Sequence, residues 1–184
     1  MGFHVIEGPA RFTEFSTIYN DSVNKVSPYQ YGEVRAERKV SVSSTLGSPV
    51  TTYNPITRTW IFIKAEGAIV ANNAIERDVG ATTVAEQYAG KQSTGLLNWA
   101  LFVGVSNHII TAGYGGWVIY SGLCRCIGDG TPTKGSLITT AATGEVALLG
   151  TPAALVNTIT NHAIGISMED GGATGDLILL HLRP

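Results

Sequence analysis

Short runs of mainly apolar residues with few polar breaks recur along the chain, and glycine-rich turns separate many of them. The clearest run is residues 59–64, Thr-Trp-Ile-Phe-Ile-Lys, whose aromatic and β-branched side chains are typical of a strand. Several short strands with glycine turns and little helix predict a mainly β fold, either a β-barrel or a sandwich. Further strands are predicted at residues 39–43, 100–105, 117–121, 123–127, 136–140, 146–149, 163–168 and 177–182.

Helix signals are few, and we expect one or two short helices. Apolar residues recur at spacings of three and four over residues 79–90, which predicts a helix there. A second short helix is predicted at 152–160, where Thr151 stands at the N-cap and Pro152 at the first helical position. Asp170-Gly171 between the last two predicted strands is a strong hairpin signal.

The first 58 residues differ in texture from the rest. They hold four of the seven prolines and isolated apolar residues, with too little periodic apolar surface to form a core. We therefore predict an extended N-terminal arm at residues 1–58 and a β-rich body at residues 59–184. Such an arm either wraps along the folded body or reaches a partner.

Charged residues make up only 14% of the chain, and glycine contributes 22 residues. Ordinary globular proteins carry roughly 25% charged residues. A surface poor in charge suits a protein that is covered by neighbours, because charged residues are depleted at the centres of interfaces. A small β-domain that is simply neutral is the alternative.

Charge and hydropathy also exclude two partner classes. The net charge of −2 and the lack of clustered Lys and Arg argue against binding to nucleic acid. No apolar run approaches the ~20 residues of a membrane-spanning helix, so we expect no membrane partner. The N-terminal residues lack a signal-peptide pattern, which predicts a protein made in a cytoplasm.

Catalytic and metal-binding patterns are weak throughout. The carboxylates of Glu145, Glu169, Asp170 and Asp176 fall in predicted turns, and nothing pairs them across a cleft. No serine lies in a Gly-x-Ser-x-Gly elbow, and the histidines are scattered. We therefore expect no enzyme activity, no cofactor and no metal. The cysteines at 124 and 126 fit small buried apolar side chains better than a disulfide or half a zinc site.

The most informative stretch is aromatic: Tyr114-Gly-Gly-Trp117-Val. Two large rings flank glycines immediately before a predicted strand, with Tyr120 following and Trp60 in the strong strand upstream. These rings are candidates for a core, for an interface, or for both, because Trp and Tyr are frequent interface anchors.

Residues 109–122, Ile-Ile-Thr-Ala-Gly-Tyr-Gly-Gly-Trp-Val-Ile-Tyr-Ser-Gly, resemble a Tyr-Gly-Trp-Val pattern found in small capsid decoration (cement) proteins of tailed bacteriophages. The resemblance covers residues 59–184 as an order of motifs. The other motifs are Trp-Ile-Phe-Ile-Lys-Ala at 60–65, Lys-Gly-Ser-Leu at 134–137, Ile-Gly-Ile-Ser-Met at 164–168, the turn Asp-Gly-Gly at 170–172 and the strand 177–182. The chain departs from the pattern in having two glycines before Trp117, where one is usual.

The resemblance implies a β-barrel or β-tulip body, a homotrimer, and a place in the virion, on the outer surface of the capsid. There the protein would bridge and stabilise neighbouring subunits of the major capsid protein. Apolar residues of the arm would then offset the entropy lost when it orders on the shell. The alternatives are another virion module, such as a fibre base or tail-attached part, and a glycan- or ligand-binding β-barrel with Tyr114, Trp117 and Tyr120 as a stacking platform. The candidate arm contacts are Phe12, Phe15, Ile18, Tyr19, Tyr29 and Tyr31.

Overall fold

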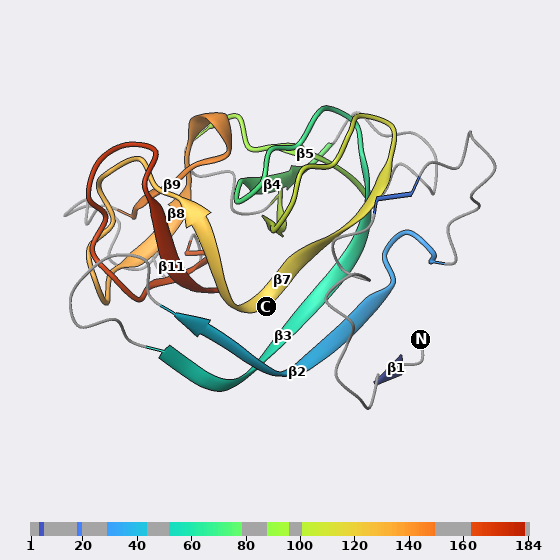
Figure 1. Ribbon diagram of the computed structural model, residues 1–184. Coiled ribbons are helices and arrows are strands. Elements are labelled where there is room, and N and C mark those ends of the chain that lie inside the picture. Colours follow the sequence, from blue (N-terminus) through green and yellow to red (C-terminus); the bar gives the residue numbers. More distant parts are fainter. Residues whose placement is uncertain are drawn as a thin grey trace.

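The computed structural model describes residues 4–5, 18–19, 29–43, 52–78, 88–95, 101–149 and 163–182. The predicted mainly β fold is confirmed (Figure 1). A three-residue 3-10 turn, η3, interrupts the strands at Ala142–Gly144. The strands are β1 (His4–Val5), β2 (Val34–Ser43), β3 (Thr52–Ala65), β4 (Ala74–Arg77), β5 (Ala89–Gln92), β6 (Phe102–Ser106), β7 (Gly115–Ile127), β8 (Leu137–Thr140), β9 (Val146–Leu148), β10 (Gly165–Ser167) and β11 (Leu177–Leu182).

Strand β7 joins two groups of strands into one mixed sheet. In the first group, β3, β5, β4, β6 and β7 pair in that order, and β3 also pairs with β7, so the pairing closes into a ring. In the second, the other half of β7 pairs with β11, followed by β10, β8 and β9. A parallel bridge between Gly128 and Val146 links β9 to the end of β7. The 13-residue strand β7 therefore carries both halves of the body.

Strands β2 and β3 form a long antiparallel ribbon along one side of the body (Figure 1). The pairing extends from Val34 opposite Ile61 to Ser43 opposite Thr52, and β1 adds in parallel at the other edge of β2. Strand β3 therefore runs across the predicted division between residues 58 and 59. The part of the predicted arm from residue 34 to residue 43 belongs to the sheet.

Four loops share one backbone pattern, and they interlock in two pairs. We call residues 66–73 and 107–114 the first loop pair, and residues 129–136 and 168–176 the second loop pair. In each loop a residue with positive φ stands directly before the residue that leads into the next strand. These residues are Asn72 (φ 64°), Gly113 (80°), Gly135 (81°) and Gly175 (93°).

The same backbone hydrogen bonds hold both loop pairs. In the first, Ala65 N donates to Tyr114 O and Gly113 N donates to Ala65 O, at 2.9 and 2.6 Å. In the second, Ser167 N donates to Ser136 O and Gly135 N donates to Ser167 O, at 3.0 and 2.8 Å. The partner loops repeat the pattern around Ser106 and Gly128. The body therefore contains the same arrangement of two interlocked loops twice, although the chain has no exact sequence repeat.

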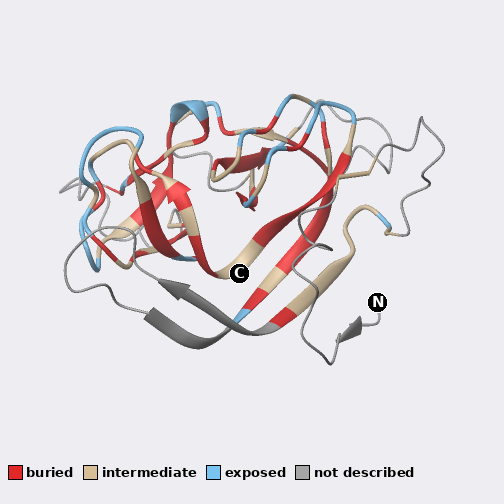
Figure 2. Cartoon of the chain, in the orientation of Figure 1, coloured by how far each residue is buried: buried red, intermediate tan, exposed pale blue. Residues whose placement is uncertain are grey.

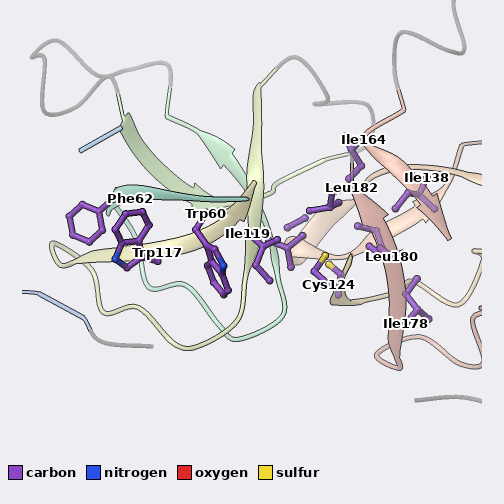
Figure 3. Close-up of a cluster of buried hydrophobic side chains, with 14 residues drawn as sticks. Trp60, Phe62, Trp117, Ile119, Cys124, Ile138, Ile164, Ile178, Leu180 and Leu182 are labelled. Carbon is purple, nitrogen blue, oxygen red and sulfur yellow. The ribbon is translucent and has the colours of Figure 1, made fainter. Parts of the chain in front are cut away.

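Two clusters of buried apolar side chains fill the body. One lies on the face of β3 and β7 that carries Trp60, Phe62 and Trp117, and it continues to β11 in the second half (Figure 3). The other lies on the opposite face of the same two strands, with Ile61, Ile63 and Val118 among its members. Burial concentrates on β3, β7 and β11, and exposed residues gather in the loops (Figure 2). Because the larger cluster crosses β7, the two halves share a core.

Two sequence-based predictions need correction. The helix predicted at 79–90 is wrong at its end, because Ala89 and Gly90 lie in β5; residues 79–87 and the helix predicted at 152–160 lie outside the described residues. The two strands predicted at 117–121 and 123–127 are one strand. Gly122 has φ 96°, and a Cβ there would lie 2.5 Å from Thr57 O, so this glycine allows close approach of β3 without ending the strand.

Candidate partner-binding surface

Part of the N-terminal segment lies against the aromatic face of β3 and β7. The ring of Tyr31 stacks on Phe62, with centroids 5.4 Å apart and an interplanar angle of 9°. Tyr29 meets Trp117 edge-on at 5.1 Å, and Tyr19 meets Phe62 at 5.9 Å. Such aromatic pairs contribute about 0.5–1.5 kcal/mol each beyond the area that they bury. The three tyrosines remain partly exposed, so this surface is both an internal packing layer and accessible from outside.

Backbone hydrogen bonds fix the same segment to the body. Tyr19 and Gly115 exchange two bonds of 2.8 and 2.7 Å, and Gly32 N donates to Phe62 O at 2.7 Å. A Cβ at Gly115 would lie 2.5 Å from the Phe62 ring, and one at Gly116 would lie 2.7 Å from Ile110. Each glycine of the Gly-Gly pair before Trp117 therefore makes room for a different side chain. This explains locally why the chain has two glycines here.

Arg35 caps the aromatic layer from β2. Its guanidinium carbon lies 4.6 Å from the Tyr29 ring centroid and 5.5 Å from that of Trp117. Its Nε donates to Glu33 Oε1 at 2.7 Å. A cation–π contact of this kind contributes about 0.5–2 kcal/mol. The start of β2 therefore places a partly exposed charge pair beside the aromatic rings.

A buried polar network fastens β2 to β3 and β7. Glu37 and Arg58 are 5% and 7% exposed, and Arg58 Nη1 lies 3.9 Å from Glu37 Oε2. The same carboxylate oxygen accepts a 3.0 Å hydrogen bond from Trp60 Nε1. Arg58 Nε donates to Leu123 O at 2.6 Å. Burial lowers the pKa of Arg58, and the nearby Glu37 carboxylate opposes that shift. The alternating basic and acidic residues at 33–39 are typical of a solvated strand face, but this network takes Glu37 into the interior.

The predicted contact residues divide into three groups. Tyr19, Tyr29 and Tyr31 lie together on the aromatic face, and Ile18 packs against the opposite cluster. Phe12 and Phe15 lie outside the described residues. Their contact with a partner stays a prediction.

The aromatic motif is split between the two faces of β7. Trp60 and Trp117 are fully buried in the larger cluster, whereas Tyr114 and Tyr120 pack half-buried against the opposite cluster. Residues 117 and 120 are three apart on a strand, so they point to opposite faces. The stacking platform suggested for a glycan, with Tyr114, Trp117 and Tyr120 side by side, therefore does not form.

Carboxylates of the loops hold turns together by accepting backbone hydrogen bonds. Glu169 accepts from Leu179 N at 2.6 Å, Asp170 from Lys134 N at 2.8 Å, and Asp176 from Ala173 N at 2.7 Å. Buried Glu76 likewise accepts from Thr94, through both its hydroxyl and its N–H. These contacts give the acidic side chains a role in the architecture of the loops.

Among the residues that the structure describes, no three His, Cys, Asp or Glu side chains are grouped so that they could hold a metal ion. Within the same residues, no helix has the length and apolar character needed to cross a membrane. Cys124 and Cys126 are buried free thiols, which confirms the interpretation of both as small apolar side chains. Burial raises the pKa of Cys124 to about 12 and that of Cys126 well above the ordinary value.

Sequence reasoning missed Phe62, Arg35 and the buried pair Glu37 and Arg58. The alternation of 59–64 places Trp60 and Phe62 on one face, and that pattern alone could have added Phe62 to the aromatic set. The charged residues gave no such signal, because their burial depends on which strand β2 joins.

No family model and no curated protein matches this chain. Among solved structures, the chain is similar to the N base of the head fiber protein gp8.5 of bacteriophage phi29, with a TM-score of 0.47 and 13% sequence identity. The match covers 67% of this chain and 92% of the other. Two chains at this level of similarity need not share a fold.

Proposed function

We propose that this chain is a structural protein of a tailed-bacteriophage virion, and specifically a decoration protein. It binds the outer surface of the capsid and bridges neighbouring subunits of the major capsid protein. One observation carries the proposal: the two strongest motifs of the resemblance belong to one structural unit. The strand at 60–65 and the Tyr-Gly-Gly-Trp strand pair residue by residue, with Phe62 opposite Trp117.

The physical character of the described residues supports this role. Aromatic rings, a buried ion pair and two interlocked loop pairs give a rigid body, and a rigid body loses little conformational freedom when it docks. Few charges on the chain suit a surface that neighbours cover. On a shell with many equivalent sites, weak contacts from each copy of a trimer act together through avidity.

The first experiment is a pelleting assay with expanded capsids that have been stripped of this protein, and with unexpanded procapsids as the control. We expect saturable binding to the expanded capsids. Light scattering on the free protein tests the trimer: three copies of the 19.4 kDa chain are expected. No binding to either shell would refute the decoration role.

The arm is tested by deleting residues 1–17, which leaves the described contacts of Tyr19, Tyr29 and Tyr31 in place. A longer deletion through residue 40 would also remove Glu37, which is buried against Trp60 and Arg58. The shorter deletion removes Phe12, Phe15 and the two-residue edge strand β1, and we expect a folded protein with weaker capsid binding. Full binding by this variant would show that residues 1–17 do not contact the shell.

A further inference from the structure

The first loop pair presents two large apolar side chains to solvent. Val70 is 49% exposed and Ile109 is 66% exposed. Among the described residues, only one other large apolar side chain is exposed, Leu148 at 37%. Ile69 and Ile110 form an antiparallel bridge, so Val70 stands directly opposite Ile109 on the outer side. The two exposed side chains therefore form one patch.

The second loop pair shows that the fold does not require apolar residues there. By their shared backbone hydrogen bonds, Ile109 corresponds to Thr131 and Val70 to Gly172 on the partner loop. Thr133 also corresponds to Val70 when each loop is counted back from its positive-φ residue, because each of the two stands two residues before it. All of these positions are exposed, and in the second loop pair none of them is apolar and large. The second loop pair therefore forms the same interlocked arrangement without large apolar side chains at these exposed positions.

The apolar residues that pack inside the interlocked loops are buried. Ile69 and Ile110 are completely buried, and Pro132 at the equivalent position of the second loop pair is buried as well. The apolar character of Ile69 and Ile110 is thus explained by packing. That of Val70 and Ile109 has no such explanation, and it exposes apolar surface to water at a cost that contact with a partner would relieve.

Charge and area restrict the partner. The single carboxylate in the first loop pair, Glu66, is 3.1 Å from Lys64, so the patch presents no unpaired formal charge. An uncharged patch does not suit nucleic acid or another strongly charged surface. Two side chains also fall far short of the ~800 Å² per partner that a stable free dimer buries. Such a small contact gains strength only when many copies bind a repeating surface together.

We infer that Val70 and Ile109 form the contact by which this protein docks onto an uncharged apolar site that repeats over the outer surface of the capsid shell. The inference rests on the proposed function and names the surface of the chain that faces the shell.

The test replaces both residues by the residue type found in the second loop pair, in the double variant Val70→Thr/Ile109→Thr. Because threonine already occupies equivalent positions in the same molecule, we expect an unchanged midpoint of urea unfolding. Apparent affinity for expanded capsids should fall at least about tenfold, since two exposed apolar side chains are lost from every copy. Leu148→Thr is the matched control and should bind as the original protein does.

A second variant, Ile109→Lys, places a charge in the patch at a side chain that is already two-thirds exposed, and it should also lose capsid binding. Normal binding by both variants would overturn the inference while leaving the proposed function intact. Loss of binding by all proteins, including the original and Leu148→Thr, would refute the proposed function and this inference with it. Self-association of the original protein that the double variant abolishes would assign the patch to a second copy of the chain instead.

Discussion

Breaking the ion pair between Glu37 and Arg58 is the perturbation whose effect the structure defines best. Glu37→Gln keeps an oxygen that can accept the hydrogen bond from Trp60 Nε1, and it removes the negative charge beside a guanidinium that is only 7% exposed. Breaking one side of a buried pair costs about 3–5 kcal/mol, because the other charge stays in the interior without its counter-ion. Since the hydrogen bond to Trp60 is retained, we expect a loss near 3 kcal/mol.

Two further variants separate the contributions of charge and hydrogen bond. Glu37→Ala also removes the acceptor of the Trp60 hydrogen bond, which adds about 1–3 kcal/mol to the loss. The double variant Glu37→Gln/Arg58→Met removes both charges and also the hydrogen bond from Arg58 Nε to Leu123 O, so its unfolding free energy should lie about 1–2 kcal/mol below that of the original protein and above that of Glu37→Gln. The strength of the pair lies in the mutual compensation of two buried charges.

Urea unfolding followed by tryptophan fluorescence measures the free energy of unfolding of all four proteins, and Trp60 lies within the network that the variants change. The expected order of stability is the original protein, then the double variant, then Glu37→Gln, then Glu37→Ala. If Glu37→Gln unfolds at the same urea concentration as the original protein, the ion pair does not fasten β2 to the body. A double variant less stable than Glu37→Gln would refute the compensation.

Three further predictions follow from single sites. Gly115→Ala should lower the unfolding free energy by about 1–3 kcal/mol, because its Cβ meets an aromatic ring at 2.5 Å; Gly67→Ala, with nothing within 4 Å, is the control and should change it by less than about 0.5 kcal/mol in the same urea assay. Burial lowers the pKa of His108 from 6.5 to about 4. The free energy of unfolding should therefore fall by about 2–3 kcal/mol as the pH is lowered from 6.5 through 4, and His108→Phe should abolish that part of the pH dependence. The thiols of Cys124 and Cys126 should resist iodoacetamide at pH 8 in the folded protein and react after unfolding in urea, as measured by mass spectrometry; equal rates in both states would contradict their burial.

The strands that could be predicted from the sequence are those whose own residues are mainly apolar. Residues 59–64 and 177–182 are mainly apolar with few polar breaks, and both lie in strands packed in the core. Strand β4 gave a weaker signal, because Glu76 interrupts its apolar residues. The structure buries that carboxylate by giving it the N–H and hydroxyl of Thr94 as donors, a compensation that lies 18 residues away in sequence.

The interlocked loops could not be predicted for a similar reason. Their bonds join residues about 40 positions apart, such as Ile69 with Ile110, and the four loops share a backbone pattern rather than a sequence. The position with positive φ is glycine in three of the loops. In the loop at 66–73 it is Asn72, a residue type that also tolerates positive φ. Local residue patterns identified the turns but not their partners.

The candidate surface was predicted in part. The sequence predicts Tyr19, Tyr29 and Tyr31 as contacts with a partner, and the structure places them together on the aromatic face of the chain's own body. The sequence showed that these rings needed a surface to pack on, and only the topology could show which surface it is. The exposed pair Val70 and Ile109 gave no sequence signal, because Ile69 and Ile110 beside them are equally apolar and completely buried.

The measurement that tests the central claim most directly is the number and location of copies of this protein in purified virions. Quantitative mass spectrometry against the major capsid protein gives the number, and labelled antibody seen by electron microscopy gives the location. The account predicts a copy number that scales with the number of capsomers and labelling over the whole head. A few copies confined to the tail or to isolated fibres, or none at all, would contradict it.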